Sequence, residues 1–421
     1  MNTVKRYKQY KLDNGLVVAL QNTPTETIAG RLNVWHGALN EMEGEEGLVH
    51  FVEHVILDGS RKYSFEQALR IIDSFGFFNA ETQLDKTIFP VDLLSEDIEL
   101  YLDFISDAVF HPSFHLEKVE QERQRIIREI SDNEGYPAFE DLRITNEAYY
   151  GKNSQYTYYI GGKEEVIRNS TIDDLRRVHR RGYHPNNMNL ILVGGLPRNI
   201  EELIEKYFGH IHIRGGERVT FIPNKPLTEK TIFHTYAPDL YNKQNPEESS
   251  AALYIKIYAP TKLTDDEISF AVLDSILGGG WKSLLFQEIS QKKGLAYYIK
   301  SSYNREHNQG ILKIRSDIHA NRLEETINSI FEQLSFLKNN LVSQEEIDRI
   351  KKKTKYYFAK HFETNEGRGS LIEMEMKCYN YGYIMSELDK VTPKRILEVA
   401  NKYLPDRDGN YVLLLRDPLK K

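Results

Sequence analysis

The sequence predicts an α+β fold with two similar domains, each a mostly antiparallel sheet with helices packed on one face. Three observations predict this fold. Strand patterns and helical patterns occur in both halves, the two halves follow the same plan, and a polar stretch with two prolines at 223–226 lies between them. Such a long period indicates a domain-scale duplication and not a solenoid repeat. We therefore expect homologous domains at 1–222 and 227–421.

The first half begins with two apolar segments that are typical of strands, at 15–20 and 28–35. Helical patterns and one further β segment follow. The helical patterns lie at about 46–58, 64–75, 95–110 and 114–133, and the β segment lies at 82–94.

The second half repeats this plan. Strand patterns occur at 251–258, 295–303 and 308–317, and helical patterns at about 264–277, 282–292, 320–338 and 343–360. The pair of helices expected at 95–133, joined by a short turn, has a counterpart at 320–360. This recurrence is the strongest sign of duplication within the chain.

Composition and net charge exclude some classes of function. Hydrophobic residues make up 40% and charged residues 28% of the chain, which is ordinary for a soluble globular protein. The net charge of −7 argues against nucleic acid as the main partner, because phosphates require a basic excess. No apolar stretch is long enough to span a membrane. With Cys378 as the single cysteine and no apolar leader in the first ten residues, we expect a cytoplasmic protein.

The segment 50–54, His-Phe-Val-Glu-His, is the most informative motif. His50 and His54 are one helical turn apart, so both imidazoles can reach one metal ion. Glu53 can point toward the same ion as a general base, and H-x-x-E-H is the inverted form of the zinc-peptidase helix. Catalytic zinc takes three protein ligands and leaves a position for water, so a third ligand is needed.

Glu122 and Glu129 are the candidates for this third ligand. They lie two turns apart on the helix expected at 114–133, and they therefore share a face. On the helix pattern alone, however, solvated surface charges are the favoured interpretation of both glutamates.

A second candidate feature is the segment 79–82, Asn-Ala-Glu-Thr, before the β segment that contains Pro90. Proline confines a strand to a sheet edge or a bulge, so we expect an edge strand here. An edge can bind an extended peptide through main-chain hydrogen bonds, or it can simply face solvent.

Taken together, these motifs resemble the M16 peptidases, the family of pitrilysin, insulysin and the mitochondrial processing peptidase. The resemblance includes H-x-x-E-H, the later pair of glutamates, Asn-Ala-Glu-Thr, Tyr-His-Pro-Asn-Asn-Met at 183–188 and the glycines at 278–280. It implies that His50, His54 and Glu129 bind Zn²⁺ and that Glu53 is the base. Glu122 would orient a ligand histidine, and Asn79 and Ala80 would bind substrate.

The sequence departs from the family pattern in the second half. Single-chain and homodimeric members carry an arginine and a tyrosine seven residues apart, but here Ser290 precedes Tyr297. Tyr297 is retained as a candidate substrate-binding residue, whereas serine cannot replace the cation or the bidentate donor. Lys292 and Lys293 are out of register with the missing arginine.

The resemblance therefore implies a zinc endopeptidase subunit for short or unfolded peptides. The chain would form half of a clamshell with a homologous partner that supplies the Arg/Tyr pair, as in bacterial peptide-maturation and leader-processing systems. Two alternatives are a self-sufficient homodimeric peptidase and a non-catalytic scaffold of the same fold. Mn²⁺ or Co²⁺ could occupy the same ligands as zinc.

Overall fold

The computed structural model describes residues 7–152, 154–157, 159–213, 227–245, 249–305, 310–377 and 379–419. The chain divides into two compact units. The first comprises Met1–Tyr136, Tyr158–Thr220 and Phe358–Tyr381, and the second comprises Pro137–Thr157, Phe221–Tyr357 and Gly382–Lys421. The polar stretch expected to link the halves, 223–226, lies outside the described residues. The boundary between domains at 222 and 227 therefore stays a prediction.

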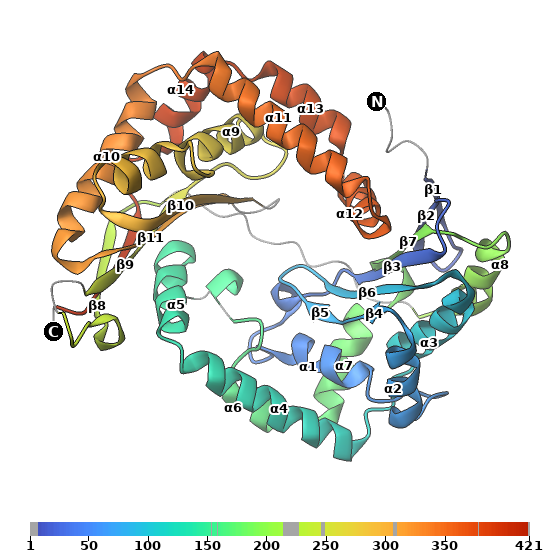
Figure 1. Cartoon of the computed structure of the whole chain (residues 1–421). Coiled ribbons are helices and arrows are strands. Elements are labelled where there is room, and N and C mark those ends of the chain that lie inside the picture. Colours follow the sequence, from blue (N-terminus) through green and yellow to red (C-terminus); the bar gives the residue numbers. More distant parts are fainter. Residues whose placement is uncertain are drawn as a thin grey trace. The chain divides into compact units, whose positions relative to one another are not determined.

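The first unit contains a seven-stranded sheet (Figure 1). Its strands, in spatial order, are β1 (Lys8–Lys11), β2 (Val17–Asn22), β7 (Met188–Gly194), β3 (Thr27–Val34), β6 (Thr87–Leu94) and β4 (Phe77–Phe78), and β5 (Glu81–Thr82) also pairs with β6. Only β2 and β7 are parallel. The strand pairing therefore matches the mostly antiparallel sheet that the sequence predicts.

Helices cover one face of this sheet and share one apolar core with it. They are α1 (Leu48–Ile56), α2 (Phe65–Ser74), α3 (Ile98–Phe110), α4 (Leu116–Glu134), α6 (Glu164–Asn169), α7 (Ile172–Gly182) and α8 (Ile200–Ile204). On the other face, α12 (Asn365–Met376) packs Ile372 against Ala19, Ile191 and Val193. This helix comes from the second half of the sequence.

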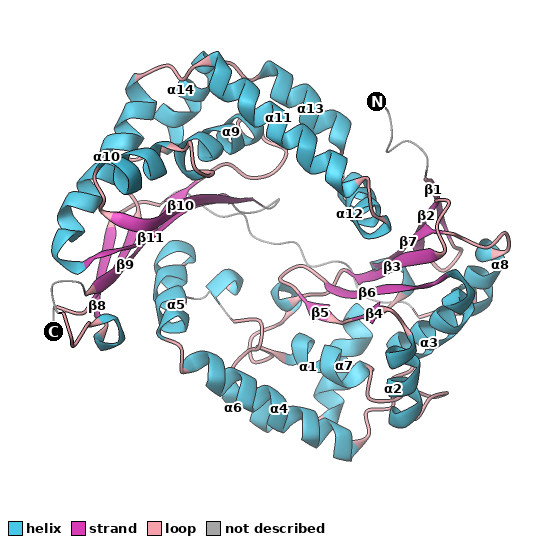
Figure 2. Ribbon diagram, viewed as in Figure 1, coloured by secondary structure: helices cyan, strands magenta, loops and turns pink. Residues whose placement is uncertain are grey.

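The second unit repeats the topology with five strands (Figure 2). Their order is β10 (Ala296–Arg305), β11 (Gly310–His319), β9 (Ser250–Tyr258), β12 (Val412–Asp417) and β8 (Thr231–Tyr236), with only β8 and β12 parallel. The helices of this unit are α5 (Pro137–Tyr150), α9 (Glu267–Gly278), α10 (Leu323–Asn339), α11 (Gln344–His361), α13 (Tyr381–Lys390) and α14 (Pro393–Tyr403). The same strand order and directions in both units confirm the duplication.

The α+β fold is thus confirmed, with one feature that the sequence pattern did not reveal. Each half of the chain contributes one helix to the other compact unit, since α12 packs on the first sheet and α5 packs on the second. The expected helix at 282–292 ends in a π-helix at Phe286–Lys292. Among the described residues, no helix combines the length and the apolar content needed to cross a membrane.

The expectation for Pro90 is wrong. Its strand, β6, lies between β3 and the edge pieces β4 and β5, and its pairing with β3 is regular. The carbonyl of Pro90 accepts the N–H of Asn79 at 3.1 Å. Because the N–H and C=O of a strand residue point to the same side, the absent N–H faces the interval between β4 and β5. There the ladder loses no hydrogen bond, so an inner strand tolerates proline.

Candidate metal centre

The site is built on α1, and the start of this helix depends on glycine and on a buried carboxylate. Gly47 has φ +97°, and a Cβ at this position would lie 2.6 Å from the carbonyl oxygen of Gly161. Glu41 accepts the N–H groups of Gly47 and Val49 at 3.0 and 2.9 Å. It therefore satisfies amides of the first turn, which have no partners inside the helix. Burial raises the pKa of Glu41 to about 8.

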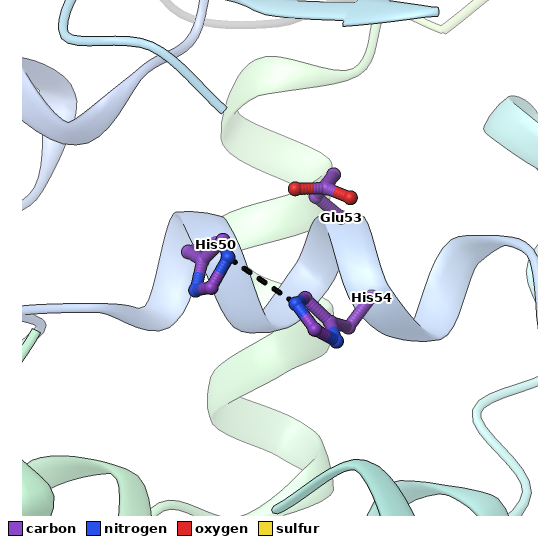
Figure 3. A group of neighbouring side chains, drawn as sticks. All are labelled: His50, Glu53 and His54. Carbon is purple, nitrogen blue, oxygen red and sulfur yellow. Dashed lines mark hydrogen bonds between the residues drawn. The ribbon is translucent and has the colours of Figure 1, made fainter. Parts of the chain in front are cut away.

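His50 and His54 point toward each other across one turn of α1 (Figure 3). Their Nε2 atoms are 3.2 Å apart. Two nitrogen ligands at about 2.1 Å from a tetrahedral zinc ion lie roughly 3.4 Å apart, so the two rings are arranged for one metal. Burial lowers the pKa of His50 to about 3, which favours the neutral imidazole that a metal requires.

Glu122 on α4 fixes the tautomer of His54. The Nδ1–H of His54 donates to Glu122 Oε2 over 2.7 Å, because a carboxylate only accepts. The Nε2 lone pair is consequently free to bind a metal. Burial disfavours the charged form of His54, but its bond to Glu122 and the nearby charges of Glu53, Glu122 and Glu129 together outweigh burial and leave the pKa of His54 above its usual value. A carboxylate partner of this kind orients ligand histidines at zinc sites.

Glu53 lies on the same helix and is only 8% exposed. The hydroxyl of Thr82, on the edge strand β5, donates to Glu53 Oε2 over 3.2 Å. Burial raises the pKa of Glu53, and His54 and the bonds from Thr82 oppose that rise. A carboxylate in this setting exchanges a proton closer to neutral pH than an exposed glutamate does.

Among the described residues, one group of three potential metal ligands has its atoms within 4.8 Å of one another, and it comprises His50, Glu53 and His54. Glu129, on α4, lies outside this group. Its carboxylate is close enough to raise the pKa of Glu53 and of His54. The hydroxyl of Tyr159 donates to Glu129 Oε1 over 3.3 Å. The assignment of Glu129 as the third ligand stays a prediction.

The donor set of this site fits zinc. The imidazoles of His50 and His54 face each other, and His54 is held in the tautomer that can bind a metal. The carboxylate of Glu129 approaches from α4. Nitrogen and carboxylate oxygen are the usual ligands of catalytic zinc.

Asn79 and Ala80 lie in the interval between β4 and β5, at the end of the sheet. Asn79 is exposed and Ala80 is half-buried against the core of the first unit. In the described structure β5 pairs only with β6, so its other side is a free edge. Because Thr82 of this edge contacts Glu53, the edge and the candidate base are adjacent. The role of Asn79 and Ala80 in binding substrate stays a prediction.

Tyr297 and Ser290 lie in the second unit. Tyr297 is 97% exposed, and it is the extra residue of a β-bulge between Ala296 and Tyr298 in β10. Bulges often re-aim a side chain next to a functional site. Ser290 is half-buried in the π-helix that precedes β10.

Three residues support the site without having been assigned these roles from the sequence. Glu41 caps α1, Thr82 holds Glu53, and Tyr159 holds Glu129. The only signal for Thr82 was its place in the Asn-Ala-Glu-Thr segment. Glu41 and Tyr159 are ordinary residue types in loops, and only the folded chain brings them to the site.

Comparisons with known proteins identify the family of the chain. The family model "Insulinase (Peptidase family M16)" matches residues 16–158, and "Peptidase M16 inactive domain" matches residues 169–354. The chain belongs to the M16 peptidase family. The inactive-domain match covers the part of the chain where the sequence shows no second His/Glu motif.

Relatives that are named zinc proteases match nearly the whole chain. An uncharacterized zinc protease of Bacillus subtilis, YmxG, is 28% identical over 424 residues, covering 98% of each chain. An uncharacterized zinc protease of Mycobacterium leprae, ML0855, is 26% identical and covers 96% of this chain and 90% of its own length.

Solved structures share the M16 fold. A protease from Helicobacter pylori superposes with a TM-score of 0.83 at 20% identity, covering 97% of this chain and 99% of its own. The periplasmic protease PqqL from Escherichia coli gives a TM-score of 0.79 at 17% identity, covering 97% of this chain and 47% of its own. At these identities the likeness concerns the fold alone.

Proposed function

We propose that the chain is the zinc-binding subunit of a metalloendopeptidase that hydrolyses short or unfolded peptides. The observation that carries this proposal is the facing pair of histidine Nε2 atoms, 3.2 Å apart, beside a buried glutamate on the same helix. His50, His54 and Glu129 would hold the ion, and Glu122 would orient His54. Nothing structural requires a buried glutamate at position 53, which favours catalysis over a scaffold role.

In this proposal Glu53 moves the protons. A bound zinc ion supplies Lewis acidity, which lowers the pKa of water and polarises the peptide carbonyl. Glu53 accepts the proton of the attacking water and passes it to the leaving amine. Thr82 keeps the carboxylate of Glu53 in place, and the edge formed by β5 would hold the extended substrate beside it.

The proposed partner is a homologous subunit that supplies the Arg/Tyr pair. Ser290 offers no cation, and the two nearby lysines are engaged in local ion pairs. Lys292 binds Glu288 at 2.8 Å, and Lys293 binds Glu332 at 3.0 Å. Both lysines are also out of register with the missing arginine, which supports a heteromer over a self-sufficient homodimer. A cytoplasmic location and a role in peptide maturation belong to the same proposal.

Cleavage of a quenched fluorescent peptide tests this function. The purified chain, with its zinc content measured, is assayed alone and with a co-expressed homologue that carries the Arg/Tyr pair. We expect one equivalent of zinc, no cleavage by the chain alone, and cleavage by the pair that a chelator and Glu53→Gln both abolish. Glu117→Gln, an exposed change on α4, is the matched control.

The other outcomes separate the alternatives. Cleavage by the lone chain, lost in Glu53→Gln, would establish the homodimeric or monomeric enzyme and remove the need for a partner. Zinc binding without cleavage in any pairing would favour the non-catalytic scaffold.

A further inference from the structure

A cluster of four cations, none of which has a role assigned above, lies on one face of the second sheet. Lys313 on β11 is directly opposite Lys256 on β9, and Arg315 on β11 is directly opposite Lys300 on β10. Residues two apart on a strand share a face, so the four side chains form two adjacent rows. Like charges placed opposite each other in a sheet are destabilising.

The described residues provide little negative charge to offset this cluster. Lys256 is 4% exposed, and its Nζ donates to the neutral side chain of Asn146 at 2.6 Å. Within the described part of the chain, Lys300, Lys313 and Arg315 make no ion pair, although Arg315 lies over the ring of Tyr254. Burial, with Lys313 second, lowers the pKa of Lys256 to about 7, as expected when no carboxylate is near.

These cations line a cavity of about 370 Å³ between the sheet and α5. Its carboxylate is Asp141, which is already paired with Arg416 at 3.1 Å. Asp317 lies one row farther along β11, opposite Tyr298. Tyr254, Tyr298 and Leu142 add apolar surface to the walls. The cavity is thus cationic, partly apolar, and of a size that accepts a few residues of a peptide.

We propose that this cavity binds an extended acidic segment of a peptide, with two carboxylates separated by one residue. The two rows of cations are two residues apart along β11, and this is the spacing of alternate side chains in an extended chain. One carboxylate would face Lys256 and Lys313, and the other would face Lys300 and Arg315. The side chain between them would point away from the sheet, toward the wall of the cavity that α5 forms with Leu142.

The same spacing argues against a phosphate ligand. The oxygens of one phosphate group converge on a point and would engage one row, leaving the other row of like charges unrelieved. This inference deepens the proposed function and rests on it, because it names the class of peptide that the chain would bind.

Fluorescence anisotropy with labelled peptides tests the cavity. A peptide with Glu-Phe-Glu is titrated with the full chain after chelation, so that no cleavage occurs, alongside the same peptide with Gln-Phe-Gln. We expect the acidic peptide to bind at least about tenfold more tightly, and the difference to shrink at high salt. The double variant Lys313→Gln/Arg315→Gln should remove the difference, whereas Lys352→Gln/Lys355→Gln, exposed lysines of α11, should keep it.

Equal binding of the two peptides, or an unchanged difference in the cavity variant, would overturn the inference. So would displacement of the acidic peptide by tripolyphosphate at concentrations below the Kd of the peptide. The comparison of the two peptides needs no altered protein, so it holds even if the variant misfolds. Failure here with intact cleavage of other peptides would leave the proposed peptidase standing. Binding here without any cleavage by the paired enzyme would reject the peptidase and keep the site.

Discussion

At the scale of single residues, the bond from His54 to Glu122 carries the most information. It joins α1 to α4 over 2.7 Å, and it leaves the Nε2 of His54 directed at His50. The acidic partner therefore does not need to touch the metal to control its binding. Its importance rests on the orientation and the basicity that it gives to one imidazole.

Replacing Glu122 with glutamine should weaken zinc binding by about 10–100-fold, because an amide orients the imidazole less firmly and no longer raises its basicity. Competition with a chromophoric chelator measures the affinity. Glu117→Gln, on the exposed side of the same helix, should bind zinc as the wild type does. Equal affinity in Glu122→Gln would show that the bond from His54 has no influence on the site.

At the scale of elements, the placement of α1 depends on how the helix begins. Gly47 combines a positive φ with a close approach to the loop at Gly161 and Gly162. The buried carboxylate of Glu41 holds the first amides of the helix. The position of the two histidines thus depends on a turn in which a side chain at position 47 would clash with Gly161.

Gly47→Ala should destabilise the first unit by about 1–3 kcal/mol, since the new Cβ adds a clash to an unfavourable φ. Gly44→Ala is the matched control, because Gly44 has φ +82° but no atom within 4 Å of an added Cβ. Thermal unfolding of the two variants separates strain of the backbone from the close approach. Equal melting temperatures for both variants would contradict the role given to the contact with Gly161.

At the scale of the whole molecule, the chain does not fold as two sequential halves. Glu373 on α12 pairs with Arg31 on β3 at 3.0 Å and also with Lys86, so a buried carboxylate of a late helix binds the helix to the first sheet. In the second unit, Arg416 on β12 pairs in the same manner with Asp141 on α5. Each compact unit therefore requires residues from both halves of the sequence.

Glu373→Gln should destabilise the first unit by roughly 3–5 kcal/mol, because it leaves the buried cation of Lys86 and the half-buried cation of Arg31 without their carboxylate. Urea unfolding can be followed by Trp35, which lies near Lys86, once Trp281 of the second unit is replaced by phenylalanine. Glu366→Gln, an exposed change on the same helix, should leave the transition unchanged. A shift of similar size in both variants would exclude a specific role for the buried pair.

The sequence predicted the helices and strands with strong periodicity, and their observed bounds differ from the expected ones by a few residues. It did not predict β8 or β12, nor the helices α5 and α12 as parts of the opposite units. Periodicity describes how an element exposes its faces but not which distant element covers them. The expectation that Pro90 lies in an edge strand failed for the same reason. Whether a proline disrupts a sheet depends on which neighbouring strand its missing N–H would face.

The sequence by itself determined that His50, Glu53 and His54 lie together, because one turn of a helix fixes their separation. It also determined the family, through motifs that span both halves. Only the tertiary structure decided that Thr82 and Glu122 hold this helix's side chains and that four cations share one face of the second sheet. Those contacts join segments far apart in the chain, and their geometry depends on strand register and packing, which local spacing does not encode.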